Sequence, residues 1–214
     1  MDELSPIRPG DVPELARLHR AAFPEFFLSR LGEPFLRQFY RGFVCDDTAV
    51  TVVRRANNGT PLGTVVGTTE PAGFYRRLIR RRLVPIALAS ARAVLRDPRT
   101  VGRLVRGVRY RGGVGERNAT PGDALLASIC VSPDGQRAGS GARLLAAWEA
   151  EVARRGSSSA YLTTDAENND GVNAFYARAG WVCDRAVITR EGRRMNLYTK
   201  ELSGASEGYD NRRD

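Results

Sequence analysis

The sequence predicts a single α/β domain, and three observations support this: its length, its alternation of strand-like and helix-like stretches, and one glycine-rich turn. A chain of 214 residues is long enough to bury a substantial core. Its hydrophobic share of 42% and charged share of 27% are ordinary for a globular protein. These values exclude a mainly disordered chain, a coiled coil and a collagen-like repeat.

The first half of the chain predicts helices followed by a β-hairpin. Asp11 and Glu14 have the spacing of a helix capping box. Phe35, Phe39 and Phe43 repeat every fourth residue, which indicates a helix face that packs into the core. The expected elements are a strand over 3–8, a helix that begins near Asp11, a helix over 28–43, and a hairpin that pairs 48–55 with 62–69.

The second half predicts strands that alternate with helices. Gly180 has the position of a helix C-cap. The polar tail over 203–214 is expected to be disordered, and the folded domain is expected to span 1–202. The expected elements are a strand over 124–131, a helix over 141–155, a strand over 159–164, a helix over 172–179, and a closing hairpin of 181–189 with 195–201.

The positive charge of the chain is concentrated in one segment. The formal net charge is +9, and residues 74–113 alone carry +11, because twelve arginines there are opposed by a single acid, Asp97. The remainder is close to neutral. We therefore predict a basic helical insert over 71–120 in an otherwise near-neutral domain.

Cysteine and histidine usage argues against disulfides and metals. The three cysteines are far apart and odd in number, and the one histidine, His19, is expected on a solvated helix face without a catalytic role. No metal is expected. The acidic N-terminus has no apolar stretch, so no signal peptide is expected and a cytoplasmic location with reduced thiols is predicted.

The most informative motif is the turn QRAGSGA over 136–142, which follows a strand and opens a helix. Glycines there let backbone N–H groups converge on an anion, and the helix N-terminus adds the positive end of its dipole. This arrangement suits a pyrophosphate. The turn lacks the Gly-Lys-Ser/Thr of nucleoside triphosphatases and meets only one of the three Rossmann glycine spacings.

Two motifs in this order give the chain its resemblance to a known family. Gln136, Gly139 and Gly141 match the Q/R-x-x-G-x-G/A loop of the GNAT superfamily of acyl-CoA-dependent N-acyltransferases. Residues 169–181 resemble the family's Asn…Tyr-x-x-x-Gly-Phe pattern, with Trp181 in place of phenylalanine. The resemblance covers 7–202 apart from the insert. It implies a central mixed, mostly antiparallel sheet flanked by helices, with the basic helical insert between the third and fourth strands.

The resemblance also implies a donor site for acetyl-CoA or another acyl-CoA. The end of the fourth strand would pair with the pantetheine amides, the loop would hold the pyrophosphate, and the following motif would contact the pantetheine arm. The implied donor-binding residues are Ile129, Cys130, Val131, Gln136, Arg137, Ala138, Gly139, Ser140, Gly141, Ala142, Asn169 and Phe175.

Tyr176 is the expected general acid. A tyrosine of pKa about 10 differs by only ~1.5 units from a departing thiolate of about 8.5, so it can donate its proton; the alternative is that it only packs at a helix end. The identity of the general base stays open, because Leu125 stands at the position where many relatives carry a glutamate. Glu70 and Asp165, each at a strand end, are the candidates, acting through water near Ser128; either could equally cap a turn.

The acceptor is expected against the connection between the first two helices. Glu25, Phe26 and Phe27 combine aromatic rings with a carboxylate, which suits a small amine or an amino sugar, and Ser128 is expected nearby. The same rings could be core. The opening helices and insert also resemble GNAT members from polysaccharide and secondary-metabolite gene clusters, which favours a small-metabolite acceptor in biosynthesis.

Three roles stay open for the arginine-rich insert. It could be a solvated helical cover, a docking surface for an acidic acyl-carrier protein whose phosphopantetheine replaces CoA, or a contact with an anionic lipid, a lipid-linked sugar or nucleic acid. Its aromatic residues are only Phe74, Tyr75 and Tyr110, which makes nucleic acid the least favoured.

The sequence thus predicts an N-acyltransferase that moves an acetyl or other small acyl group from a CoA thioester to an amine of a small metabolite or amino sugar. Direct attack in a ternary complex is expected, because no neighbouring base is expected to activate Cys130 as a nucleophile. The alternatives are transfer from an acyl-carrier protein, acetylation of a protein N-terminus or lysine, and a non-catalytic scaffold that binds an anionic partner.

Overall fold

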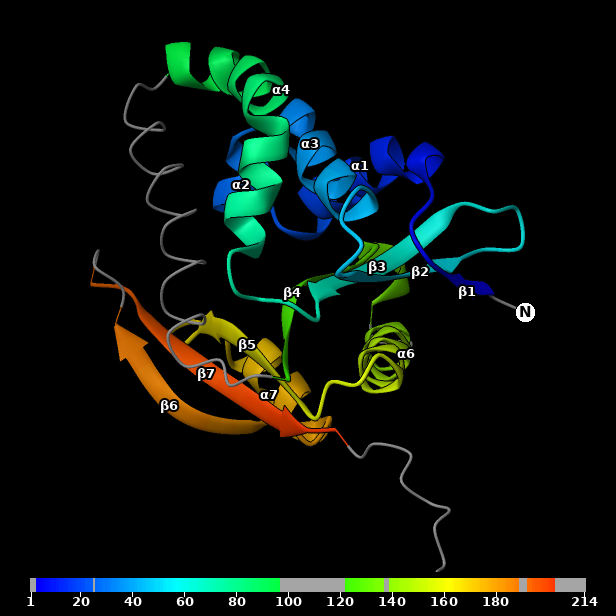
Figure 1. Ribbon diagram of the computed structural model, residues 1–214, viewed down its shortest axis with the longest axis vertical. Helices are drawn as coiled ribbons and strands as arrows, with labels where there is room; N and C mark the ends of the chain where they lie inside the picture. Colours follow the sequence, from blue (N-terminus) through cyan, green and yellow to red (C-terminus); the bar gives the residue numbers. More distant parts are fainter. Residues whose placement is uncertain (1–2, 25, 97–121, 137–138, 189–191, 203–214) are drawn as a thin grey trace, which may run out of the picture.

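One seven-stranded sheet organises the protein. The computed structural model describes residues 3–24, 26–96, 122–136, 139–188 and 192–202. The strand order is β1-β2-β3-β4-β5-β7-β6, and every neighbouring pair is antiparallel except β4 and β5 (Figure 1). The strands are β1 (Glu3–Ser5), β2 (Ala49–Arg55), β3 (Pro61–Thr68), β4 (Asp123–Val131), β5 (Ser159–Asp165), β6 (Val182–Ile188) and β7 (Arg194–Glu201). The helices are α1 (Val12–Ala22), α2 (Phe27–Arg30), α3 (Glu33–Val44), α4 (Phe74–Arg96), α6 (Ser140–Arg154) and α7 (Asp170–Arg178).

The strands and helices expected in the described ranges are present with small shifts in their bounds, and one helix differs. The helix expected over 28–43 is divided into α2 and α3 at Gly32, whose φ of +91° is left-handed and cannot continue a helix. Pro34 then stands in the first turn of α3, where its missing N–H costs nothing. The expected strand over 3–8 is reduced to β1. The later part of the insert, 97–121, and the tail, 203–214, lie outside the described residues.

Helices cover both faces of the sheet (Figure 1). Side chains from α1, α3 and the start of α4 pack with Val66, Leu125 and Tyr161 on one face, which we call the α1/α3 face. The predicted core residues Phe35, Phe39 and Phe43 belong to this cluster, as expected. On the other face, called the α6/α7 face, α6 and α7 pack over a second cluster that includes Leu144, Trp148, Val152 and Tyr176.

Helix α4, the described part of the insert, packs closely on α3. Phe74 and Leu78 are buried, and a Cβ atom added to Gly42 of α3 would lie 2.6 Å from Leu78 Cγ. The two helices therefore cross at a glycine. Arg82 departs from helical geometry (φ −127°, ψ 16°) three residues before Pro85, whose ring nitrogen cannot donate a helical hydrogen bond, so α4 is kinked there.

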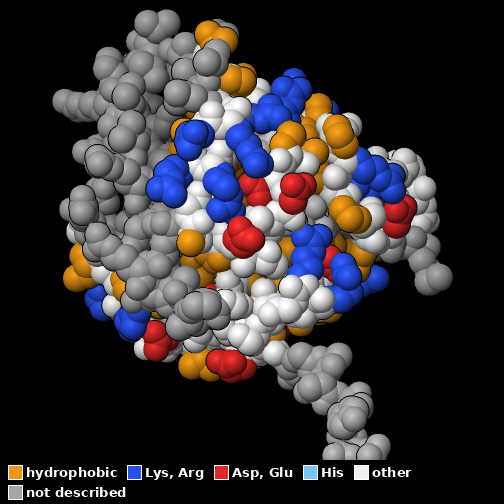
Figure 2. Space-filling model, in the orientation of Figure 1, with side chains coloured by type: hydrophobic (Ala, Val, Ile, Leu, Met, Phe, Trp, Pro, Cys, Tyr) orange, Lys and Arg blue, Asp and Glu red, His pale blue; other side chains and the backbone are white. Residues whose placement is uncertain are grey.

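Three arginines of α4 fasten the helix to the body of the protein. Arg77 donates to the carbonyl oxygens of Ala72 and Glu70, Arg81 donates to the carbonyl of Cys45, and Arg82 donates to the side chain of Gln38. The carboxylate of Asp46 lies 3.6 Å from Arg77 and 3.5 Å from Arg81. Basic and acidic side chains accordingly stand together beside α4 (Figure 2). These arginines of the insert therefore stabilise the packing of α4 on the rest of the domain.

Two expectations about polar residues of α1 are wrong. The Asp11 side chain does not cap α1; its carboxylate accepts hydrogen bonds from Arg55 at 2.6 and 2.7 Å and from the backbone N–H of Arg8. Glu14 instead pairs with Arg17. His19 is not on a solvated face but is buried, because it continues the stripe that begins at Val12.

Candidate active site

The sheet opens between β4 and β5. These parallel strands are paired only over Asp123–Leu125 and Ser159–Tyr161, after which they separate, although β5 stays paired with β7 along its whole length. The backbone groups that β4 directs toward β5 beyond Leu125 therefore have no strand partner. The predicted pantetheine-binding residues Ile129, Cys130 and Val131 lie on this unpaired half of β4.

A bulge turns the side chains of β4 at the point where the strands separate. Val66 of β3 is opposite Ser128, but the next residue, Gly67, is opposite Leu126, so Ala127 is the extra residue. Directly opposed residues share a face. Ser128 therefore lies on the α1/α3 face with Val66, beside the opening, which is the side on which the acceptor is expected.

The glycine-rich loop follows β4 and leads into α6. Gly139 is the N-cap residue with a left-handed φ of +73°, and Ser140 begins the helix. The Ser140 hydroxyl donates to the carbonyl of Gly135 at 2.9 Å, and Gln136 Nε2 donates to the carbonyl of Val131. These bonds fold the loop back onto the end of β4, so it lies at the open end of the sheet. The predicted donor residues Arg137 and Ala138 lie outside the described residues.

Arg54 is a contact that sequence reasoning missed. Its Nη1 donates to the Ser140 hydroxyl at 2.5 Å, which brings a guanidinium from β2 to the first turn of α6. The two residues are 86 positions apart, and no local pattern predicts such a contact.

Helix α7 closes the other side of the opening. A Cβ on Gly141 would lie 3.3 Å from the ring of Phe175, so glycine allows the start of α6 to pack against α7. Asn169, the N-cap residue of α7, donates its Nδ2 proton to the carbonyl of Asp165, and Asn173 donates to the same oxygen. Of the predicted residues of this motif, Asn169 therefore lies at the end of β5 and Phe175 lies against the start of α6.

Tyr176 is buried, and its hydroxyl has no partner among the side chains that the structure describes. Its ring packs at 5.9 Å from those of Trp181 and Tyr198. Burial raises the pKa of this hydroxyl well above its usual value, so it stays protonated at neutral pH. Burial is the sole cause of this shift, and no hydrogen bond from a described side chain contributes to it.

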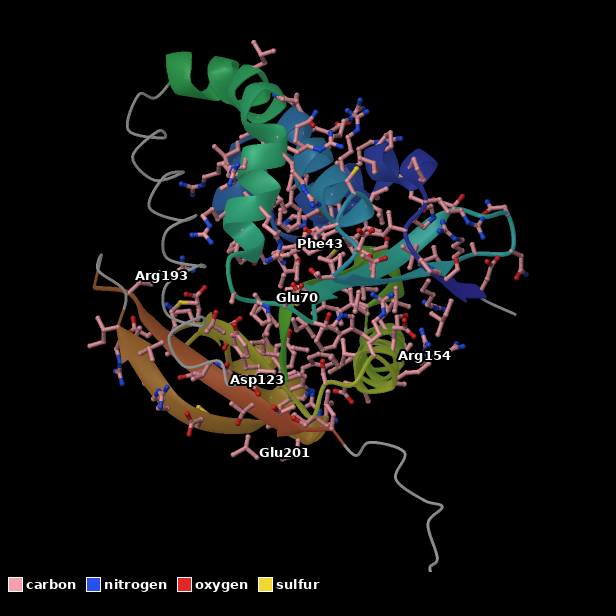
Figure 3. The ribbon with its side chains drawn as sticks, in the orientation of Figure 1. Phe43, Glu70, Asp123, Arg154, Arg193 and Glu201 are labelled. Atoms are coloured by element: carbon pink, nitrogen blue, oxygen red, sulfur yellow. The ribbon has the colours of Figure 1, made fainter. Side chains whose placement is uncertain are left out.

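The two candidate bases lie at different ends of the sheet. Glu70 follows β3, whose end is opposite Leu125 at the paired end of β4, and its side chain is 67% exposed. Asp165 ends β5, and Arg193 donates to both of its carboxylate oxygens. Figure 3 labels Glu70 beside the end of β3 and Arg193 beside the start of β7. The structure thus does not bring the two carboxylates together.

The thiol of Cys130 is not set up as a nucleophile. It is fully buried beside the hydroxyl of Tyr40, and burial raises its pKa to about 11. A thiol with that pKa carries almost no thiolate at neutral pH.

The predicted acceptor wall is described only in part. Phe26 is half-buried, and its ring lies 6.4 Å from that of His19. Glu25 and the side chain of Phe27 lie outside the described residues. Among the side chains that the structure describes, no three His, Cys, Asp or Glu converge as metal ligands would. No helix in the described ranges is long and apolar enough to cross a bilayer.

Known acetyltransferases share this fold. A GNAT-family protein from Desulfovibrio desulfuricans has a TM-score of 0.65 and 15% identity, with 95% of this chain and 100% of that chain covered. The ribosomal-protein-S18-alanine N-acetyltransferase from Escherichia coli has a TM-score of 0.58 and 16% identity, with 98% of this chain and 99% of that chain covered. An aminoglycoside 6'-N-acetyltransferase in complex with coenzyme A has a TM-score of 0.58 and 13% identity, with 94% of this chain and 97% of that chain covered.

Sequence comparison identifies the family. No curated protein sequence matches this chain. The profile of the acetyltransferase (GNAT) family, by contrast, matches residues 12–181, a range that contains the divergent strands, the glycine-rich loop and Tyr176. The chain therefore belongs to the acetyltransferase (GNAT) family and is a GNAT-family N-acetyltransferase.

Proposed function

We propose that this protein transfers an acetyl group, or another small acyl group, from a CoA thioester to an amine of a small metabolite or amino sugar. The observation that carries the proposal is the opening between β4 and β5 with the glycine-rich loop at its mouth. The family uses acyl-CoA donors. The opening offers a strand edge for pantetheine amides, and the loop offers backbone N–H groups for a pyrophosphate.

The residues of the opening have separate roles in this proposal. The unpaired backbone of Ile129, Cys130 and Val131 binds the pantetheine arm, and Asn169 and Phe175 lie along its other side. The loop from Gln136 to Ala142 binds the pyrophosphate. The left-handed Gly139 and the hydrogen bond from Ser140 support the loop conformation.

Tyr176 supplies the proton in the proposed reaction. The acceptor amine attacks the thioester carbonyl, the C–S bond breaks, and the thiolate of CoA takes the proton of the Tyr176 hydroxyl. A hydroxyl without a partner in the described protein is free to bond to a ligand sulfur. Its raised pKa keeps the proton on the hydroxyl until the thiolate forms, and it also widens the difference from the thiolate pKa beyond the ~1.5 units of the free groups.

The amine must lose a proton before or during its attack. Asp165 is held by Arg193 in a two-point ion pair, whereas Glu70 lies at a longer 3.9 Å from Arg77, is largely exposed and can exchange protons with water. Glu70 is therefore the better of the two candidates, acting through water toward Ser128. The proposal puts the acceptor on the α1/α3 side of the sheet, supported by the half-buried Phe26 and by the position of Ser128 on that face.

Calorimetric titration tests the donor assignment first. We expect acetyl-CoA and free CoA to bind, because both carry the pantetheine arm and the pyrophosphate. An acyl-carrier protein should bind more weakly, since the described α4 arginines lie on the α1/α3 face and the loop joins α6 on the opposite one. If neither acetyl-CoA nor CoA binds, the proposal is wrong. With the donor bound, a panel of amino sugars, small amines and N-terminal peptides then identifies the acceptor class by release of free thiol.

A further inference from the structure

A chain of buried polar side chains links the two walls of the site. His19 Nδ1 of α1 lies 2.9 Å from the Tyr40 hydroxyl of α3, and this hydroxyl lies 3.4 Å from Cys130 Sγ of β4. The three residues are 1%, 0% and 2% exposed. They come from three separate elements and meet within an otherwise apolar cluster.

One end of this row of three polar side chains, Cys130, lies on the donor strand β4. Cys130 lies on the half of β4 that has lost β5 as a neighbour. That half is held on one side by β3, where Thr64 is opposite Cys130, and on the α1/α3 face by the contact with Tyr40. The neighbours of Cys130 in the strand, Ile129 and Val131, belong to the proposed pantetheine site.

The other end lies among aromatic rings. The imidazole of His19 is 5.3 Å from the ring of Phe23, 6.4 Å from Phe26 and 6.2 Å from Phe39, measured between ring centroids. Phe23 and Phe26 belong to the connection between α1 and α2, where the acceptor is expected. The three hydrogen-bonding side chains therefore extend from the proposed acceptor wall to the proposed donor strand.

Tyr40 and Cys130 act through hydrogen bonds and not through charge. Burial raises the pKa of Tyr40 well above its usual value and that of Cys130 to about 11, so both keep their protons at neutral pH. The tyrosine hydroxyl has one proton, so it can donate to one neighbour while it accepts from the other. Removing the hydroxyl would leave polar groups unsatisfied at both of its ends.

We propose that Tyr40 and His19 are positioning residues for acyl transfer, which hold Cys130, and with it the unpaired half of β4, in place against the aromatic wall of the acceptor site. This inference rests on the proposed function. The donor then meets a strand edge that is fixed before it binds, and an acceptor packed on Phe23 and Phe26 contacts the same rigid unit. Neither residue touches the reacting atoms.

Acetyl-CoA affinity of four variants tests the role of the chain. Tyr40→Phe keeps the ring and removes the hydroxyl, and Cys130→Ala removes the other end; each should weaken acetyl-CoA binding by roughly three- to tenfold, the range of one lost hydrogen bond. The double variant should bind acetyl-CoA as tightly as whichever single variant binds it more weakly, because the two substitutions break the same linkage. Cys130→Ser keeps a hydrogen-bonding group and should recover most of the acetyl-CoA affinity that Cys130→Ala loses.

Thr68→Val is the matched control. The Thr68 hydroxyl is also buried and makes two hydrogen bonds, to Thr48 Oγ1 and to the N–H of Glu70, but it does not contact β4 through them. This variant should lose thermal stability without losing acetyl-CoA affinity. Should Tyr40→Phe fail to give a cooperative unfolding transition, Cys130→Ala and Cys130→Ser provide the comparison alone.

The possible results separate this inference from the proposed function. If the unmodified protein does not bind acetyl-CoA, both are wrong. If it binds but Tyr40→Phe and Cys130→Ala bind equally well, or lose affinity additively, only the positioning role is wrong. A loss of affinity in Thr68→Val equal to that in Tyr40→Phe would also overturn it, because the effect would then be one of general stability.

Discussion

Arg55 and Tyr176 are both buried, but their polar groups have opposite surroundings. The guanidinium of Arg55 donates to both carboxylate oxygens of Asp11, to Ser5 Oγ and to the carbonyl of Pro6, so four of its five N–H groups are used inside the protein. The hydroxyl of Tyr176 has no such partner in the described residues. The first arrangement holds the fold together, and the second leaves a proton donor available to a ligand.

Replacing Tyr176 by phenylalanine should separate chemistry from binding. Tyr176→Phe removes only the hydroxyl, and we expect kcat to fall by about a hundredfold or more, as for loss of a general acid, with little change in acetyl-CoA affinity. Tyr198→Phe is the control, because its ring packs in the same cluster at 5.9 Å. Steady-state kinetics and calorimetry check this, and equal losses of kcat and affinity would contradict the role.

Removing Asp11 should be costly for the fold. Asp11→Ala leaves the buried Arg55 charge without its partner, and such a loss costs about 3–5 kcal/mol of unfolding free energy. The matched control is Glu3→Ala, which breaks an exposed ion pair with Arg8 at 2.9 Å. That change should cost less than about 1 kcal/mol. Urea denaturation measures both, and similar values for the two variants would show that burial of the pair is unimportant.

At the scale of elements, the loop before α6 depends on its glycine geometry. Gly139 has φ of +73° and nothing within 4 Å of an added Cβ, so its requirement is one of backbone conformation and not of space. β-branched residues avoid this region. The loop conformation that presents N–H groups to the pyrophosphate therefore depends on this position.

Substitution of two glycines compares this loop with an ordinary hairpin. Gly139→Val should abolish or strongly weaken acetyl-CoA binding, because the loop must change its conformation. Gly59 in the β2–β3 hairpin has φ of +82° and is equally open, so Gly59→Val imposes a similar strain far from the site. It should lower thermal stability by a similar amount but keep acetyl-CoA affinity. Retained binding in Gly139→Val would contradict the loop assignment.

Local sequence patterns predicted the elements well and long-range contacts poorly. The expected stop of α7 at Gly180 is found with this glycine one position later than a C-cap: Ala179 is the C-cap residue, and Gly180 follows it with a left-handed φ of +81°. His19 was placed wrongly because its neighbours Arg17 and Arg20 suggested a polar face, although its spacing from Val12 fits the buried stripe. The Arg54–Ser140 contact and the Tyr40–Cys130 contact join distant segments, and only the folded chain brings these residues together.

At the scale of the whole molecule, acid should weaken the fold through its paired carboxylates. The pKa of Glu151 is lowered to about 2, first by the hydrogen bond from Arg154 and then by Arg155, against the opposing effect of burial. Burial acts to raise the pKa of Asp11, but Arg55 and Arg8 outweigh it and the pKa is lowered. A depressed folded-state pKa gives stability that is present above the unfolded value and lost as pH falls.

We therefore expect the melting temperature to be steady from pH 7 down to about 5 and to fall below about pH 4.5, where carboxylates of the unfolded chain begin to bind protons. Thermal melts at several pH values measure the curve. Glu151→Gln should make the decline between pH 4.5 and 2 shallower, because one proton-linked group is gone. An unchanged slope would mean that the ion pairs of Glu151 add nothing to folding.

The separation of β4 from β5 has a consequence for the lifetime of the protein. Three residue pairs make up the strand pairing between the half-sheet β1–β4 and the half-sheet β5–β7, so the sheet itself has a narrow joint between two larger units. The proposed acyl-CoA donor, by forming hydrogen bonds along the open edge of β4, would act as an added strand at this joint. Anything that binds the folded state protects it from opening, and proteases cleave opened chains. The supply of acyl-CoA would then govern how long each copy survives, as well as how fast it works.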